Sequence, residues 1–221
     1  MIDDLQRDFD IQLHRWPHVV GGPNFPSEWR GLAASVSPAL KPGMHVLATG
    51  GVAITALIAM DQRTDCASLI AESMLAPAAT LRAFGLHEAA AGVEGTAQIM
   101  SRGYPGIISR LIMQGASEAE QADLAASIQR DSTEGGAFGD ATGFHSLNLL
   151  ADPPQLKVPA LYLDSLLPIA GYAEMADLFK RFAPDAEVGH LEIWPVRVQD
   201  AAAGHELAGL VRAFIAGLDT T

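Results

Sequence analysis

The segment from His45 to Met60 constrains the fold of this chain more than any other part of the sequence. It begins with HVLAT at 45–49, which is typical of a buried strand, runs directly into Gly50-Gly51, and continues as an apolar helix over Val52–Met60. A strand joined to a helix by so short a turn is typical of parallel sheets whose faces are covered by helices. The segment therefore predicts an α/β architecture.

The alternation of apolar runs and helical patterns continues along the chain. We expect further strands at Phe9–Leu13, Ala67–Met74, Pro159–Leu163 and Leu191–Trp194, and helices from Ser27 and over Ala173–Phe182. The last helix is expected to have one apolar stripe that faces the sheet, because its apolar residues recur at helical spacing: Leu207, Leu210, Val211, Phe214, Ile215 and Leu218. The fold class we expect is α/β, with a mainly parallel sheet and flanking helices.

One stretch, from about residue 77 to 150, has helical patterns and no strand signal. Within it, Ser117 and Glu120 have the spacing of a capping box at the start of a helix. A chain of 221 residues can bury one substantial core. We therefore expect a single domain over 1–221 with a helical insertion at 77–150.

The charge of the chain excludes several classes of partner. Its 14 Lys and Arg against 26 Asp and Glu give a formal net charge of −12, whereas phosphate backbones and anionic membranes attract positive charge. The N-terminus, MIDDLQRDFD, is acidic and differs from a signal peptide, and the apolar runs are shorter than a membrane span. We expect a cytoplasmic protein without a nucleic-acid or membrane partner.

No residue pattern indicates a metal or a cofactor. The single cysteine, Cys66, excludes a disulfide within the chain and a cysteine-rich metal centre. His14 and His18 stand at helical spacing, but Pro17 between them disfavours the helix that would align them. The glycine-rich segments lack the Lys-Ser/Thr ending of a P-loop. We expect neither a metal site nor a bound cofactor.

Several segments resemble α/β hydrolases. His45–Ala59 is similar to the nucleophile-elbow strand and helix of that superfamily, and Leu156–Leu163 to the segment that returns from the cap into the sheet. Phe182–Pro195 and Glu206–Leu218 resemble its last strand and last helix, so that the resemblance covers about residues 9–218. It implies an α/β-hydrolase fold, shortened by one or more early strands, with the helical stretch as a cap.

The same resemblance leaves the catalytic positions of the superfamily without their usual residues. The pattern Gly-x-Ser-x-Gly falls on TGGVA, so that Gly51 stands at the nucleophile position. The acid position falls on Pro168, and the histidine region reads Val196-Arg197-Val198-Gln199. The resemblance thus implies a degenerate member without the Ser/Asp/His triad. Gly51 either opens space for a ligand, with the Val52 amide as an oxyanion donor, or only permits the turn.

Three polar side chains remain as candidates for catalysis. Asp164 follows the strand at Pro159–Leu163, His205 lies near the start of the last helix, and Ser73 closes the strand at Ala67–Met74. Catalytic groups are recognised by their geometry and not by chain order, so a relocated site built from these residues stays open. The alternatives are a solvated helix histidine and a serine without a base beside it.

The candidates for ligand contact lie around the expected site: Trp16, Gly51, Val52, Met74, Pro168 and Val198. Trp16 belongs to HRWP at 14–17, which resembles a turn that supplies an oxyanion donor or, alternatively, a W…P…W stretch of small serine hydrolases. If the helical stretch is a cap, the cavity beneath it is apolar and suits a small apolar molecule. Its apolar residues otherwise pack only against one another.

Three functions stay open. The first is a hydrolase-fold protein that has lost its triad and binds a small apolar ligand or promotes a non-hydrolytic reaction on it. A hydrogen-bonded Ser–His or Asp–His pair in the cavity would contradict it. The second is an active esterase-like or thioesterase-like hydrolase with relocated residues, acting on a small acyl, ester or polyketide-like substrate. The third is a structural subunit, because an unpaired sheet edge predicts a homodimer or a partner chain.

Overall fold

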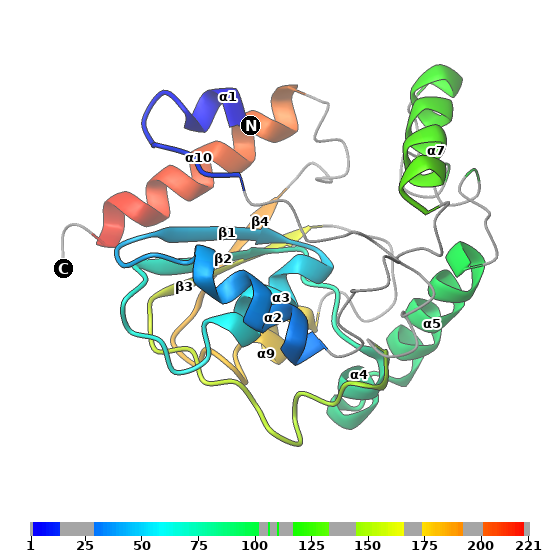
Figure 1. Cartoon of the computed structure of the whole chain (residues 1–221), viewed down its shortest axis with the longest axis horizontal. Helices are drawn as coiled ribbons and strands as arrows, with labels where there is room; N and C mark the ends of the chain where they lie inside the picture. Colours follow the sequence, from blue (N-terminus) through cyan, green and yellow to red (C-terminus); the bar gives the residue numbers. More distant parts are fainter. Residues whose placement is uncertain are drawn as a thin grey trace. The chain divides into compact units, whose positions relative to one another are not determined.

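Figure 1 shows a computed structural model of the chain, and the structure describes residues 2–13, 29–101, 106, 110, 117–132, 145–165, 174–191 and 201–218. The chain divides into two compact units. The first comprises 1–14, 36–76 and 153–221, and the second comprises 15–35 and 77–152. The first unit contains the sheet, and the described elements of the second are helices.

The sheet has four strands: β1 His45–Thr49, β2 Ser68–Glu72, β3 Ala160–Ser165 and β4 Glu187–Leu191. They lie in the order β1-β2-β3-β4, and each pair of neighbours is parallel. This confirms the predicted α/β class with a parallel sheet. Because all four strands run in one direction, their carboxyl ends meet at a single edge, where open α/β sheets place their ligands.

Helices cover both faces of the sheet (Figure 1). On one face lie α3 (Gly51–Ala59) and α9 (Met175–Phe179), and on the other lie α1 (Ile2–Leu5) and α10 (Ala201–Leu218). The predicted apolar stripe of the last helix is confirmed, because its buried residues pack against β2, β3 and β4: Leu207, Ala208, Val211, Phe214 and Ile215. Side chains alternate along a strand, so Ile70 and Glu72 face the α10 side.

Two of the predicted strands differ in the structure. Residues 9–13 are irregular, because Phe9 and Ile11 pack against the core next to α10 without joining a neighbouring strand. The last described strand, β4, is Glu187–Leu191; of the predicted Leu191–Trp194 it includes Leu191, and residues 192–194 lie outside the described residues. β4 is an edge strand of the described sheet, Glu187 and His190 are exposed, and no apolar run marks it.

The second unit contains α4 (Ala78–Phe84), α5 (His87–Ser101) and α7 (Glu118–Ser132). The helix α2 (Trp29–Val36) belongs to this unit up to residue 35, and the 3-10 helix η1 (Ser37–Ala39) belongs to the first unit. The capping box is confirmed, since the Ser117 amide donates to Glu120 Oε2 at 2.7 Å and the Glu120 amide donates to Ser117 Oγ at 3.3 Å. Whether this unit acts as a cap stays a prediction.

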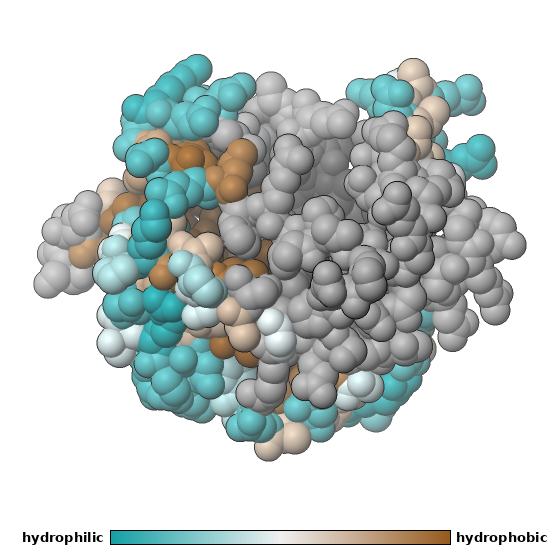
Figure 2. Space-filling model, viewed as in Figure 1, coloured by the Kyte–Doolittle hydropathy of each residue, from teal (hydrophilic) through white to brown (hydrophobic). Residues whose placement is uncertain are grey.

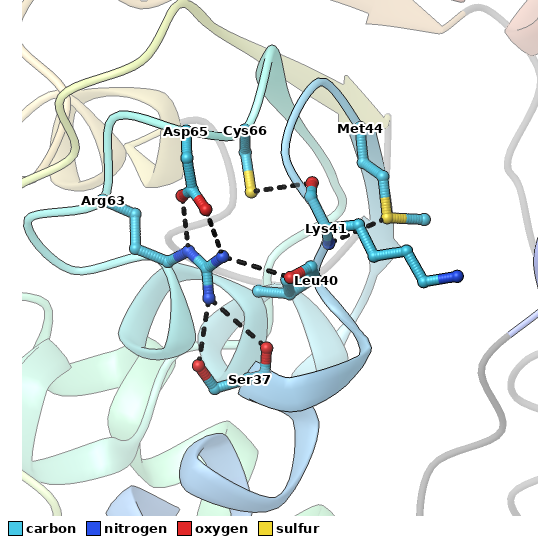
Figure 3. A network of polar contacts seen from close by, with 7 residues as sticks. All are labelled: Ser37, Leu40, Lys41, Met44, Arg63, Asp65 and Cys66. Carbon is cyan, nitrogen blue, oxygen red and sulfur yellow. Dashed lines mark hydrogen bonds and ion pairs between the residues drawn. The ribbon is translucent and has the colours of Figure 1, made fainter.

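Arg63 ties the segment before β1 to the segment before β2 (Figure 3). Its guanidinium donates to both carboxylate oxygens of Asp65, at 2.9 and 2.7 Å. It also donates to the carbonyl and hydroxyl oxygens of Ser37, at 3.3 and 3.2 Å, and to the Leu40 carbonyl at 3.1 Å. Cys66 beside it is buried, which raises the pKa of its thiol and disfavours a reactive thiolate.

We expect the Arg63→Lys substitution to lower the free energy of unfolding by about 1–2 kcal/mol, because one ammonium group cannot replace a planar donor that serves Asp65, Ser37 and Leu40 together. Urea unfolding followed by circular dichroism measures the loss. Arg7→Lys is the matched control, since that side chain is 75% exposed. Equal losses in both variants would show that the network around Arg63 adds nothing to stability.

Candidate functional site

The turn after β1 holds a backbone conformation that favours glycine. Gly50 has φ 57° and ψ −130°, and α3 begins at the next residue, Gly51. The structure therefore corrects the sequence analysis, which placed this role at Gly51. A side-chain carbon added at Gly50 would meet no atom within 4 Å, so the conformation and not crowding selects glycine here. The most strained position of the turn carries no side chain that can attack a substrate.

A second strained turn lies one strand away. Ser73 directly follows β2 and has φ 46°, which is rare for a residue with a side chain. Two backbone hydrogen bonds join the two turns. The Gly50 amide donates to the Glu72 carbonyl at 2.9 Å, and the Leu75 amide donates to the Gly50 carbonyl at 3.1 Å. The Ser73 amide donates to the Leu163 carbonyl at 3.0 Å, which holds Ser73 at the carboxyl edge.

Glu72 is a buried carboxyl group at this edge. Only 2% of the residue is exposed, and the Ser73 hydroxyl donates a hydrogen bond to its Oε1. Burial raises the pKa of Glu72 to about 7, and the hydrogen bond from Ser73 acts in the opposite direction. Its register neighbours on the adjacent strands, Thr49 and Leu163, are uncharged. Glu72 therefore changes its charge close to neutral pH.

Asp164 and His190 form a second polar pair at the same edge. They are register partners on β3 and β4, and Asp164 Oδ2 lies 3.8 Å from His190 Nδ1. Leu163 is the register partner of Glu72, so Asp164, the next residue, leaves the sheet on the opposite face. The His190 side chain is 75% exposed, whereas that of Asp164 is only 15% exposed, so the histidine is the member of the pair that faces solvent.

The structure does not bring the predicted Asp164 and His205 together as contact partners. His205 lies on α10 with Nδ1 3.1 Å from Asp4 Oδ2, and its side chain is 76% exposed. The hydrogen bond from His205 lowers the pKa of Asp4. A catalytic role for Asp164 or His205 stays a prediction.

One Ser–His pair lies at the opposite end of the strands. Ser68 Oγ and His45 Nδ1 are 2.9 Å apart and join the first residues of β2 and β1. Ser68 lies at the amino ends of the strands, away from the carboxyl edge at which open α/β sheets place their ligands. The pair therefore stabilises the amino ends of the two strands and does not form a nucleophile and base at the carboxyl edge.

A groove of about 550 Å³ lies beside β1, between the strand, the segment 5–13 and α10. Two large apolar side chains that line it are exposed, Val52 by 40% and Leu13 by 68%. Other apolar side chains in its wall are Phe9, Ile11, Leu47, Ile70, Val211 and Ile215. Figure 2 shows apolar surface in brown gathered next to α1 and α10.

The predicted ligand residues have different positions. Val52 lines the groove, Gly51 is the first residue of α3, and Met74 is completely buried. Trp16, Pro168 and Val198 lie outside the described residues. Sequence reasoning missed Glu72, although a single acidic residue in the otherwise uncharged run ASLIAESM was the available signal.

The part of the chain that the structure describes contains no group of three or more His, Cys, Asp or Glu side chains arranged to hold a metal. Within the same residues, no helix combines the length and the apolar character that crossing a membrane requires.

No family model and no curated protein matches the sequence. Solved structures match most of the chain. A hydrolase from Oleispira antarctica is 16% identical with a TM-score of 0.63, covering 86% of this chain and 72% of that protein. A bromoperoxidase from Bacillus anthracis is 10% identical with a TM-score of 0.68, covering 91% and 79%.

A protein assigned to the α/β hydrolase family from Desulfitobacterium hafniense is 12% identical with a TM-score of 0.64, covering 92% of this chain and 83% of that protein. At such identities the likeness concerns the fold alone. The parallel sheet, the strained turn after β1 and these structural matches together show that the chain has the α/β-hydrolase fold.

Proposed function

We propose that this α/β-hydrolase-fold chain binds a small apolar molecule in the groove beside β1, and does not carry out serine chemistry at the turn after β1. The groove itself carries the proposal, because its volume of about 550 Å³ lies in the range of small-molecule sites. The exposed side chains of Val52 and Leu13 would lose contact with water when a ligand binds. Each Å² of apolar surface buried in this way contributes about 25 cal/mol to the free energy of binding.

The polar residues of the groove indicate the charge of the ligand. Asp10, Gln12, His45 and Thr49 stand among the apolar side chains of its wall. A carboxylate at Asp10 and a chain charge of −12 repel anions. We therefore expect a neutral apolar ligand with one or two hydrogen-bonding groups and not a fatty-acid anion.

Titration with the neutral probe N-phenyl-1-naphthylamine tests the groove. We expect Val52→Asp to weaken probe binding about tenfold or more, because the probe must displace water from the new carboxylate. Val52 lies in the first turn of α3, where an acidic residue suits the helix dipole, so the fold should tolerate the change. The readout is the dissociation constant from probe fluorescence.

Ala213→Asp is the matched control. Ala213 is exposed on α10 and does not line the groove, so this substitution adds the same charge outside the groove wall. We expect its dissociation constant to stay within about twofold of the parent value. Equal probe binding by the parent and Val52→Asp would contradict the groove as the binding site.

β1 ends the strand order of the described sheet, so a homodimer or a partner chain at its open edge stays a prediction. A cytoplasmic location also stays a prediction.

A further inference from the structure

We propose that Ser73 and Glu72 form a nucleophile–base pair for acyl transfer, one strand away from the glycine turn after β1. Three observations support this pair: the positive φ of Ser73, the hydrogen bond from its hydroxyl to Glu72, and its place at the carboxyl edge of the sheet. None of them depends on the groove beside β1.

The backbone at Ser73 is strained in the way that a nucleophile after a strand is strained. Ser73 and Gln62 are the non-glycine residues with positive φ in the described part of the chain. Gln62 is exposed in the turn after α3, whereas Ser73 is only 6% exposed. Such strain persists when its surroundings hold it in place, and it gathers at functional sites. Here the Leu163 and Gly50 carbonyls bind the amides of Ser73 and Leu75.

Glu72 has the surroundings of a general base. It accepts the hydrogen bond from the Ser73 hydroxyl, and burial raises its pKa to about 7, close to the pH at which a base must work. No charged side chain faces it from its register neighbours, Thr49 and Leu163. On α10, which covers the same face, His205 pairs with Asp4 and Arg212 pairs with Asp8.

The pair can transfer an acyl group from a small, neutral ester or thioester. As Ser73 Oγ bonds to the carbonyl carbon, its proton passes to the Glu72 carboxylate and the carbonyl π electrons move to oxygen. The tetrahedral intermediate then re-forms the carbonyl and expels the alcohol or thiol, which takes the proton from Glu72. Water repeats the sequence on the acyl-Ser73: it gives its proton to Glu72, and Ser73 leaves with that proton.

A neutral alkyl fluorophosphonate tests the pair, since attack by Ser73 Oγ forms an O–P bond, breaks the P–F bond and releases fluoride. We expect peptide mass spectrometry to find the label on Ser73 of the full-length protein. The labelling rate should rise as pH increases through about 7. Glu72→Gln should slow labelling about 100-fold or more and remove this pH dependence, because the amide cannot accept the proton.

Ser73→Gly should abolish labelling while keeping the fold, because glycine adopts a positive φ without strain. Gln62→Gly is the matched control: it relieves the same kind of strain elsewhere and should leave the rate within about twofold of the parent rate. An unlabelled Ser73 in the folded parent at pH 8 would overturn the proposal. So would labelling of Glu72→Gln at the parent rate, or labelling of the buried Ser68 in place of Ser73.

Discussion

Replacing Glu72 with Gln is expected to make the stability of the protein much less sensitive to pH between 5 and 8. Over this interval the parent should lose about 2–3 kcal/mol more of its free energy of unfolding than Glu72→Gln does. The reason is that folding buries a carboxyl group that is ionised in the unfolded chain at these pH values, and no positive side chain among its register neighbours compensates its charge.

The direction follows from the shift in pKa. Burial raises the pKa of Glu72 from 4.5 to about 7, so the folded protein holds this proton more tightly than the unfolded chain does. Its contribution to stability is complete below pH 4.5 and disappears as pH rises through about 7. This difference between the folded-state and unfolded-state pKa of Glu72 corresponds to about 3 kcal/mol of stability, most of which is lost between pH 5 and 8.

Urea unfolding of both proteins at pH 5 and pH 8 measures the effect. The comparison cancels groups present in both proteins, including His145, whose pKa is lowered by burial and whose contribution therefore changes in the opposite direction. Burying the introduced Gln side chain changes the free energy of unfolding by the same amount at both pH values, so the comparison cancels this effect as well. Parallel changes in the two proteins would show that Glu72 titrates as an ordinary exposed carboxyl group and would remove the basis for its role as a base near pH 7.

The Phe179→Ala substitution is expected to lower the free energy of unfolding by about 3–5 kcal/mol. Phe179 on α9 and Tyr162 on β3 are both fully buried, and their rings stack with centroids 5.3 Å apart and planes 28° apart. Removing one ring leaves a cavity and exposes the face of the other, and stacked aromatic pairs add about 0.5–1.5 kcal/mol beyond their buried area.

Urea unfolding at pH 7 measures this loss as well. Phe179→Leu is the matched control, since it keeps most of the apolar volume and should cost about 1–2 kcal/mol. A domain of this size has about 5–15 kcal/mol of stability in total, so Phe179→Ala should also lower the melting temperature by several degrees. A loss below about 1 kcal/mol would show that the neighbours of Phe179 close the space.

Much of the sheet could be predicted because burial leaves a periodic pattern in the sequence. The run from β1 through Gly50 into α3 and the apolar stripe of α10 were both recognisable, since each pattern depends only on neighbouring residues. Segments 9–13 and 187–191 were not predicted correctly. The first is apolar yet pairs with no neighbouring strand, and the second is an outer strand whose polar residues face solvent.

The candidate sites were less predictable, because they join residues that the chain keeps far apart. The groove combines segment 5–13, β1 and α10, and Asp164 meets His190 only through the register of β3 and β4. Ser73 was recognisable as a serine at the end of a strand. Its hydrogen bond to Glu72 and its positive φ depend on backbone bonds to Gly50 and to β3.

The sequence by itself determined the fold class, the run from β1 through the glycine turn into α3, and the last helix, because hydrophobic periodicity and the conformational freedom of glycine act locally. Only the tertiary structure decided that Gly50 and not Gly51 adopts the strained conformation, that Glu72 is buried beside Ser73, and that His205 contacts Asp4. Burial, strain and pairing of this kind arise when distant segments pack together, so no local pattern records them.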